Sequence, residues 1–184
     1  MHTSTVCALT ATKTDFATLA GTMLDTIAAR LGVELGKDTH ADILSSFASL
    51  PAHADMKPAL TRLQSADYRT VTFTNSLVKL VTTQINNSGL SEYFDDIVSV
   101  ETTGSFKPDP KVYDFVAERL NRPIEDLRLV ATHDWDTHGA LSAGMRAAYI
   151  DRSGAPYHPR YRHPDVHATN MVDVVEQIIA RDDE

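Results

Sequence analysis

Three short polar clusters carry the side chains of this chain that could do chemistry. They are residues 72–76 (TFTNS), 105–109 (SFKPD) and 132–136 (THDWD). They supply hydroxyl and amide groups, a lysine beside a proline, and three aspartates. An ammonium group close to carboxylates is typical of a site that keeps an acid ionised. The clusters therefore favour a site for a small anionic molecule.

The first cluster places Thr74 and Asn75 between an apolar stretch and a helical pattern. Free backbone N–H groups at a helix start, from Ser76 and its neighbours, would form a site for a carboxylate or phosphate. The Thr74 hydroxyl and the Asn75 amide would add hydrogen bonds. The alternative is an ordinary helix cap, because Thr, Asn and Ser are the usual capping residues.

Lys107, in the second cluster, is followed by Pro108, Asp109 and Pro110, which restrict the backbone around it. Its ammonium group could lie over an active-site carboxylate, although most lysines are simply solvated.

The third cluster follows a predicted buried strand. Asp134 or Asp136 could orient a lysine through a charge-assisted hydrogen bond, or could cap the next helix. We expect one of the two aspartates to act as that cap. Trp135 is otherwise a core aromatic residue, and His133 a hydrogen-bonded structural residue.

The elements that must position these clusters form an alternating pattern. Residues 14–31 have the apolar stripe of an amphipathic helix, and a short helix follows up to residue 50. Strands are then predicted around residues 69–74, 97–100, 127–131 and 146–150, with helices between them. Residues 153–167 are predicted as a long surface loop, and residues 171–180 as a closing helix. This alternation predicts an α/β fold with a doubly wound, parallel, Rossmann-like sheet. Ligands bind at the carboxyl ends of such strands, where all three clusters lie.

Composition and charge exclude several classes of binding partner and cellular location. The net charge of −8 argues against nucleic acid and against an anionic membrane surface. Cys7 is the only cysteine, so an intrachain disulfide and a cysteine-based zinc site are excluded. No window approaches a membrane span of about 18 apolar residues, and the first residues make a poor signal peptide. We expect a cytoplasmic protein.

In the order of these clusters the chain resembles the haloacid dehalogenase superfamily, and within it the type II subgroup, the L-2-haloacid dehalogenases. The resemblance covers roughly residues 16–179 and includes the loop at residues 154–157 (GAPY). It implies a HAD-like α/β core formed by residues 1–12 and 51–184. Residues 13–50 would form a partial helical cap subdomain.

The resemblance also implies roles for individual residues. Thr74 and Asn75 take the positions that bind the substrate carboxylate, while Lys107 supports the nucleophile and Asp136 pairs with that lysine. The remaining substrate-site positions match as follows: Tyr113 stands six residues after the lysine, Trp135 directly precedes Asp136, and His133 stands where many members carry asparagine. Ala131 also departs from the pattern, because many members carry serine there.

The implied reaction is the hydrolysis of short L-2-haloacids to 2-hydroxy acids through an aspartyl ester, with neither a metal nor another cofactor. Phosphatase relatives bind Mg²⁺ through an acid four residues before the last-motif aspartate, and Thr132 occupies that position here. This favours a dehalogenase over a phosphatase, although Asp134 could partly substitute. The implied partner is a small anionic 2-haloacid, and many members of the subgroup are homodimers.

The attacking aspartate has no counterpart in the sequence. In the family it ends a first, central strand and is closely followed by Gly-Thr. Residues 15–22 contain these letters, but their pattern is helical, so Asp15 is interpreted as the start of a helix. We therefore expect a fold that lacks its usual first strand: either the gap closes, residues 5–10 provide a surrogate strand, or the chain folds poorly.

Two function hypotheses follow. The chain is a dehalogenase whose true start lies upstream or whose gene has lost its 5′ end, or it is an inactive, truncated remnant that acts as a binding or dimerising module. A phosphatase relative is the third alternative.

Overall fold

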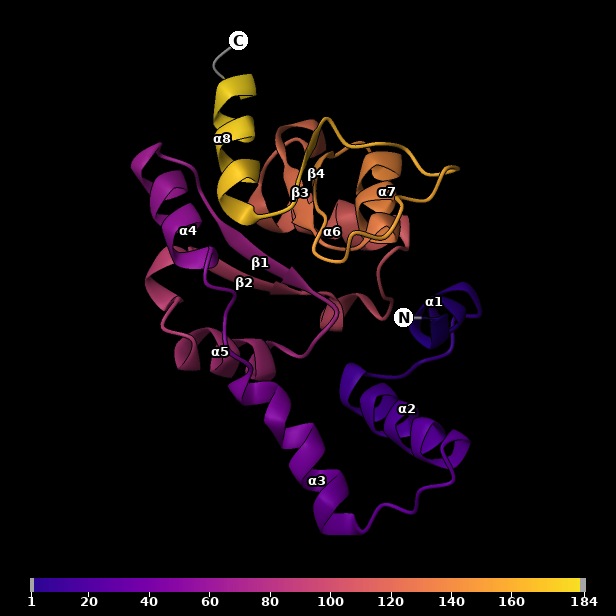
Figure 1. Cartoon of the computed structure of the whole chain (residues 1–184). Helices are drawn as coiled ribbons and strands as arrows, with labels where there is room; N and C mark the ends of the chain where they lie inside the picture. Colours follow the sequence, from indigo (N-terminus) through magenta and orange to yellow (C-terminus); the bar gives the residue numbers. More distant parts are fainter. Residues whose placement is uncertain (1, 183–184) are drawn as a thin grey trace. The chain divides into compact units, whose positions relative to one another are not determined.

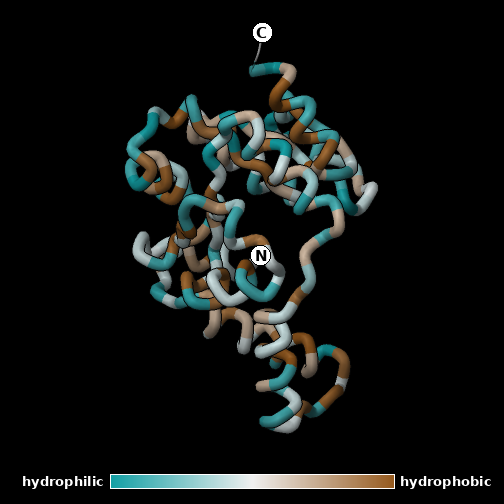
Figure 2. Tube along the Cα trace, turned by 90° about the vertical axis from the view of Figure 1, so that its left-hand side faces the viewer, coloured by the Kyte–Doolittle hydropathy of each residue, from teal (hydrophilic) through white to brown (hydrophobic). Residues whose placement is uncertain are grey.

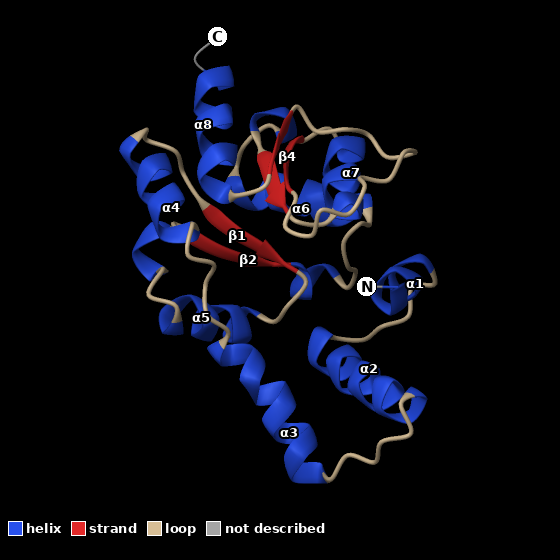
Figure 3. Cartoon of the chain, viewed as in Figure 1, coloured by secondary structure: helices blue, strands red, loops and turns tan. Residues whose placement is uncertain are grey.

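The computed structural model describes residues 2–182, which divide into two compact units (Figures 1 and 3). The first unit contains the chain up to Ala52 together with Val71–Phe106. The second contains His53–Thr70 and the chain from Lys107 onward. Met1 and residues 183–184, which the predicted domain ranges include, lie outside the described residues.

The first unit contains a pair of strands and several helices. Strand β1 runs parallel to β2, with Thr74 opposite Ser99, and helix α5 joins them and packs on β2. The unit consists of α1 (His2–Leu9), α2 (Phe16–Arg30), α3 (Lys37–Ser46), η1 (Phe47–Ser49), β1 (Val71–Thr74), α5 (Val78–Asn87), η2 (Ser91–Tyr93), β2 (Asp96–Ser99) and η3 (Val100–Thr103).

Of the three alternatives for the missing first strand, a surrogate strand at residues 5–10 does not form, because helix α1 occupies most of that segment. The Thr10 N–H and hydroxyl both bond to the Val6 carbonyl at 2.9 Å. A helix satisfies its backbone within itself, whereas a strand needs a neighbour to do so. Within residues 2–70 the structure contains helices and turns but no strand.

Helix α2 begins where the sequence predicts. The Asp15 side chain caps it by accepting a 2.8 Å bond from the Thr18 N–H. Its apolar stripe is poorly covered, because Ala28 is its only buried residue, and Ile27 and Leu31 are 49% and 72% exposed. Apolar and polar residues interleave along the helices in Figure 2. The assignment of residues 13–50 to a cap subdomain stays a prediction.

The second unit contains a three-stranded parallel sheet in the order β3-β4-β5. Helix α8 packs against α4, β4 and β5, and α7 packs against α6, β3 and β4. Its core includes Val112, Val166, Val174 and Val175, none of them measurably exposed. The elements are α4 (Met56–Ser65), α6 (Pro110–Leu120), η4 (Ile124–Asp126), β3 (Arg128–Ala131), α7 (Asp134–Ala143), β4 (Arg146–Ile150), β5 (Val166–Ala168) and α8 (Met171–Asp182).

The predicted α/β class with parallel strands is confirmed, and the four predicted strands correspond to β1–β4. Two details differ. The strands form two separate hydrogen-bonded sheets, with β1 in one and β3 in the other. The loop predicted to reach residue 167 ends earlier, because β5 pairs Val166 with Ala148 and buries it fully. This three-residue strand is hard to predict from the sequence, because the prolines and histidines near it are typical of a loop. None of the helices in residues 2–182 is long and apolar enough to cross a membrane.

Candidate active site

Lys107 is a buried cation with a fixed partner. It is 4% exposed, and its Nζ donates a 3.1 Å hydrogen bond to Oδ2 of Asp136. The chain after it enters α6 at once, because Asp109 caps the helix and Pro110 occupies its first turn. The Asp109 side chain accepts the Lys111 N–H at 3.1 Å. The start of α6 therefore fixes the backbone from which Lys107 projects.

Asp136 lies in the first turn of α7 and is 6% exposed. Its second carboxylate oxygen, Oδ1, accepts a 2.7 Å bond from the Tyr113 hydroxyl, which also lies 3.3 Å from the Asp136 carbonyl oxygen. Tyr113 comes from α6 and is fully buried. An ammonium and a phenol therefore each hold one oxygen of the same carboxylate.

Burial dominates the electrostatics of this network. Desolvation lowers the pKa of Lys107 below its usual 10.5, while the attraction of Asp136 opposes that shift. Desolvation and the negative charge of Asp136 both raise the pKa of Tyr113 well above 10, so the phenol stays a neutral donor. A buried ion pair of this kind offers little net stability, but loss of either partner is costly. The ion pair is therefore better suited to holding a positive charge at a fixed position than to stabilising the fold.

Gly139 makes this packing possible, and the sequence reasoning overlooked it. A Cβ at this position would lie 2.5 Å from the Tyr113 hydroxyl and 2.8 Å from Cβ of Pro108. Glycine inside a helix costs about 1 kcal/mol relative to alanine. A glycine in the middle of a predicted helix was therefore the signal in the sequence that another part of the chain packs closely against that helix.

The start of α7 differs from the prediction that an aspartate caps it. His133 is the N-cap residue and makes no capping bond with its side chain. Its carbonyl accepts the N–H groups of Asp136 at 3.1 Å and of Thr137 at 3.2 Å. The Asp136 carboxylate is already held by other groups, and Asp134 Oδ1 reaches only the adjacent Trp135 N–H, at 2.7 Å. The His133 ring is exposed, 5.3 Å from that of Trp135.

In the turn after β1, backbone N–H groups that were predicted to be free are hydrogen-bonded to side chains. The Ser76 N–H, predicted to be free for an anion, bonds to the Thr74 hydroxyl at 3.0 Å. At the start of α5, the Val78 N–H bonds to the Glu101 carboxylate at 3.2 Å. Short-range side-chain acceptors compete for N–H groups at turns, which explains the error. The assignment of Thr74 and Asn75 to substrate binding remains a prediction.

The structure thus places Lys107 and Tyr113 each in contact with the Asp136 carboxylate, with His133 and Trp135 in the same turn as the aspartate. These residues belong to the second unit, and Thr74 and Asn75 belong to the first. Among the described residues, no three His, Cys, Asp or Glu side chains are placed to hold a metal ion.

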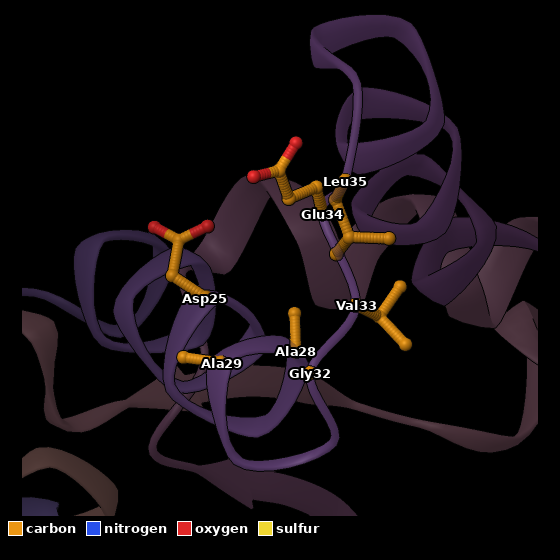
Figure 4. Close-up of a pocket in the computed structure, with 7 residues that line it drawn as sticks. All are labelled: Asp25, Ala28, Ala29, Gly32, Val33, Glu34 and Leu35. Carbon is orange, nitrogen blue, oxygen red and sulfur yellow. The ribbon is translucent and has the colours of Figure 1, made fainter.

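An open depression in the first unit involves none of these residues (Figure 4). It has a volume of about 390 Å³ and lies between the end of α2 and the following loop. Asp25 and Glu34 contribute carboxylates to its lining, beside small and apolar residues. Because two carboxylates would repel an anion, this depression does not suit a haloacid.

Comparison with known proteins gives the class to which the chain belongs. A model of the haloacid dehalogenase-like hydrolase family matches residues 3–150, so the chain belongs to this family. Relatives to which it is similar within the family include 2-haloacid dehalogenases.

The individual relatives are distant. An (S)-2-haloacid dehalogenase of Pseudomonas fluorescens is 29% identical over 127 residues, which cover 69% of this chain and 56% of that enzyme. The (S)-2-haloacid dehalogenase 1 of Pseudomonas sp. (strain CBS-3) is 26% identical over 167 residues, covering 91% and 73%. The fold resembles that of an L-2-haloacid dehalogenase from Xanthobacter autotrophicus, with a TM-score of 0.88 at 22% identity and coverage of 97% and 81%. The chain spans little more than half of the first of these enzymes.

Proposed function

We propose that this chain carries the supporting half of a site for hydrolytic dehalogenation of short L-2-haloacids to 2-hydroxy acids. The observation that carries the proposal is the buried Lys107 ammonium, held by Asp136, whose other oxygen binds Tyr113. The names of the relatives support the choice of 2-haloacids as substrate class. The metal independence and cytoplasmic location expected from the sequence are part of the proposal.

The proposed reaction has two steps. A carboxylate attacks C2 of the haloacid, the carbon–halogen bond breaks, and the halide leaves with its electron pair, so that an ester forms. Water then attacks the ester carbonyl, which releases the 2-hydroxy acid and regenerates the carboxylate. No metal is required, because cations and hydrogen bonds can hold both the halide and the substrate carboxylate.

Lys107 and Asp136 are the proposed catalytic residues of this chain. The Lys107 charge favours the ionised form of the attacking carboxylate, and Asp136 keeps that charge in place. Thr74 and Asn75 would bind the substrate carboxylate. Tyr113, His133 and Trp135 complete the set of proposed substrate-site residues.

The attacking carboxylate is the group that this sequence does not supply in a recognisable setting. Asp15 has the nearest likeness, but its carboxylate caps α2 through the Thr18 N–H and hydroxyl at 2.8 and 3.0 Å. We therefore assign only the supporting groups to the residues of this chain and assign none of its carboxylates as the nucleophile.

A phosphatase reaction is less well supported. Thr132 stands where such relatives carry an additional acid. Asp134, the potential substitute, uses one carboxylate oxygen for the Trp135 N–H and the other for the His158 N–H at 3.2 Å. A carboxylate engaged with two backbone donors is a poor candidate for a Mg²⁺ ligand.

Halide release from L-2-chloropropanoate tests the proposal. The 184-residue chain should release halide at the rate of buffer alone, and it is assayed beside the protein isolated from its producing cells. If the isolated protein releases halide, Lys107→Met in that protein should abolish release. Lys111→Met, which removes an exposed lysine four residues later, should not. Release that survives Lys107→Met would overturn the proposed role of the lysine.

A non-catalytic dimerising module is the second candidate, and the exposed apolar surface of the first unit favours it. Ile27, Leu31 and Val33 are 49%, 72% and 49% exposed. Sedimentation equilibrium should then show a dimer that Leu31→Glu dissociates and that Leu9→Glu, at an exposed position on α1, leaves intact. A monomer at all concentrations would remove this candidate.

A further inference from the structure

The segment from Tyr157 to Arg162, between β4 and β5, is attached to the flank of α7 through several contacts that the proposed reaction does not use. Arg162 donates its N–H to Nδ1 of His138 at 3.1 Å and its guanidinium to the Leu141 carbonyl at 2.9 Å. The ring of Tyr161 stacks on that of His138, with centroids 4.6 Å apart and planes within 6°. The segment therefore follows α7 over about two turns.

The Tyr157 hydroxyl is the contact closest to the lysine–aspartate pair. It lies 2.9 Å from the Thr137 hydroxyl, 3.3 Å from the Asp134 carbonyl and 2.9 Å from the Arg162 carbonyl. Thr137 is fully buried and donates to the Asp134 carbonyl at 3.0 Å. One phenol thus joins the first turn of α7 to the far end of the segment.

The next residue of the segment holds the same turn a second time. The His158 N–H donates to Oδ2 of Asp134, whose Oδ1 accepts the Trp135 N–H. Asp134 and Thr137 flank Asp136 on either side in the sequence. The segment therefore forms hydrogen bonds with residues on both sides of Asp136, the aspartate that binds Lys107.

Tyr157 is itself held rigidly enough to act as an anchor. Its ring lies edge-on to that of Tyr149, with centroids 5.0 Å apart, and 4.8 Å from the ring of His163. Tyr149 is 4% exposed and belongs to β4. An aromatic pair of this geometry contributes more than its buried area alone. Removal of the hydroxyl should leave this ring packing in place.

We propose that Tyr157 is a positioning residue for the Lys107–Asp136 pair, acting through Thr137 and Asp134 on the first turn of α7. This proposal rests on the proposed function in one respect only, namely that the Lys107–Asp136 pair takes part in dehalogenation. The phenol touches none of the groups assigned to the reaction. Its effect is to keep the turn from opening, so that the carboxylate stays against the buried ammonium.

Proton exchange of the Lys107 ammonium group, followed by NMR in the 184-residue chain, tests this proposal. Tyr157→Phe removes the bridging hydroxyl and keeps the ring. Loss of one hydrogen bond should speed exchange at Lys107 and at the Asp136 N–H by about two- to tenfold. Tyr161→Phe is the matched control, since Tyr161 contacts α7 through its ring, and exchange at Lys107 should then be unchanged.

A second variant guards against an uninformative loss of folding. Thr137→Val removes the other hydroxyl of the bridge with little change in shape, and should speed exchange at the same two positions. The proposal is overturned if Tyr157→Phe lowers the unfolding midpoint in urea and leaves exchange at Lys107 unchanged, because the hydroxyl would then serve stability alone. It is also overturned if Tyr161→Phe has the same effect on Lys107.

The test does not depend on turnover, so it separates this proposal from the proposed function. If the protein isolated from its producing cells releases halide, Tyr157→Phe in that protein should lower kcat by a similar factor and leave KM unchanged. If that isolated protein releases no halide, dehalogenation is contradicted, whereas faster exchange at Lys107 in the 184-residue chain still supports the positioning role.

Discussion

Replacement of Gly139 by alanine tests the packing of the buried network most simply. In an ordinary helix interior this change stabilises by about 1 kcal/mol, because alanine is the better helix former. Here the new Cβ would meet the Tyr113 hydroxyl at 2.5 Å and Pro108 Cβ at 2.8 Å. Overpacking of this kind costs about 1–3 kcal/mol, and displacement of the Tyr113 bond to a charged Asp136 adds about 1.5–3 kcal/mol. After the helix-propensity gain is subtracted, the net expectation is a loss of about 1.5–5 kcal/mol in the free energy of unfolding.

Urea unfolding followed by far-UV circular dichroism measures this change. Gly21→Ala in α2 is the matched control, since its Cβ would meet only Cε1 of His40 at 3.7 Å and Cδ1 of Leu44 at 3.9 Å. That variant should be more stable by about 1 kcal/mol. A Gly139→Ala protein as stable as the parent would refute the close packing of α7 against Tyr113, and with it the geometry of the site.

Three further predictions concern charge and pH. Lys107→Met leaves Asp136 buried without its cation and should cost about 3–5 kcal/mol in urea unfolding, with part recovered when Asp136→Leu is added; full additivity would contradict a coupled pair. Burial raises the pKa of Asp55, but the hydrogen bonds and charge of Arg152 and a backbone N–H outweigh burial and hold this pKa below 3.8. Its stabilisation should therefore be present above that pH and be lost as pH falls through the lowered pKa, an acid slope that Asp55→Asn should flatten. The raised pKa of Tyr113 has the opposite consequence: only the unfolded chain loses this proton above pH 10, so stability should fall there, and less so in Tyr113→Phe.

Much of the fold is predictable because its signals are local. Alternating strands and helices give the α/β class, and the pairing of Asp109 with Pro110 marks the start of α6. Asp15 likewise marks the start of α2. Capping and periodicity depend on residues a few positions apart, and the sequence displays these directly.

The remaining features depend on neighbours that the sequence does not reveal. Residues 5–10 have β-forming side chains, but no strand of the described chain pairs with them and α1 forms instead. The three residues of β5 are strand only because β4 lies beside them. The roles of Thr137 and Tyr157 likewise arise from contact across 20 positions of sequence.

The site was predictable in part. The order of the clusters indicates which lysine and which aspartates matter, and the structure shows that Asp136, rather than Asp134, holds Lys107. Spacing alone could not make that choice, because both carboxylates lie in the first turn of α7. Asp134 is taken by the Trp135 and His158 N–H groups, and a partner 24 residues away is invisible to a motif.

The central claim is that Lys107, held by Asp136, is the cation of a 2-haloacid site. The most direct test is an NMR titration of L-2-chloropropanoate into the 184-residue chain, with the lysine side chains observed individually. We expect a saturable change at Lys107, none at Lys111, and weaker binding of the D-enantiomer. A Lys107 signal that stays unchanged in excess haloacid, or that changes only as much as that of Lys111, would contradict it.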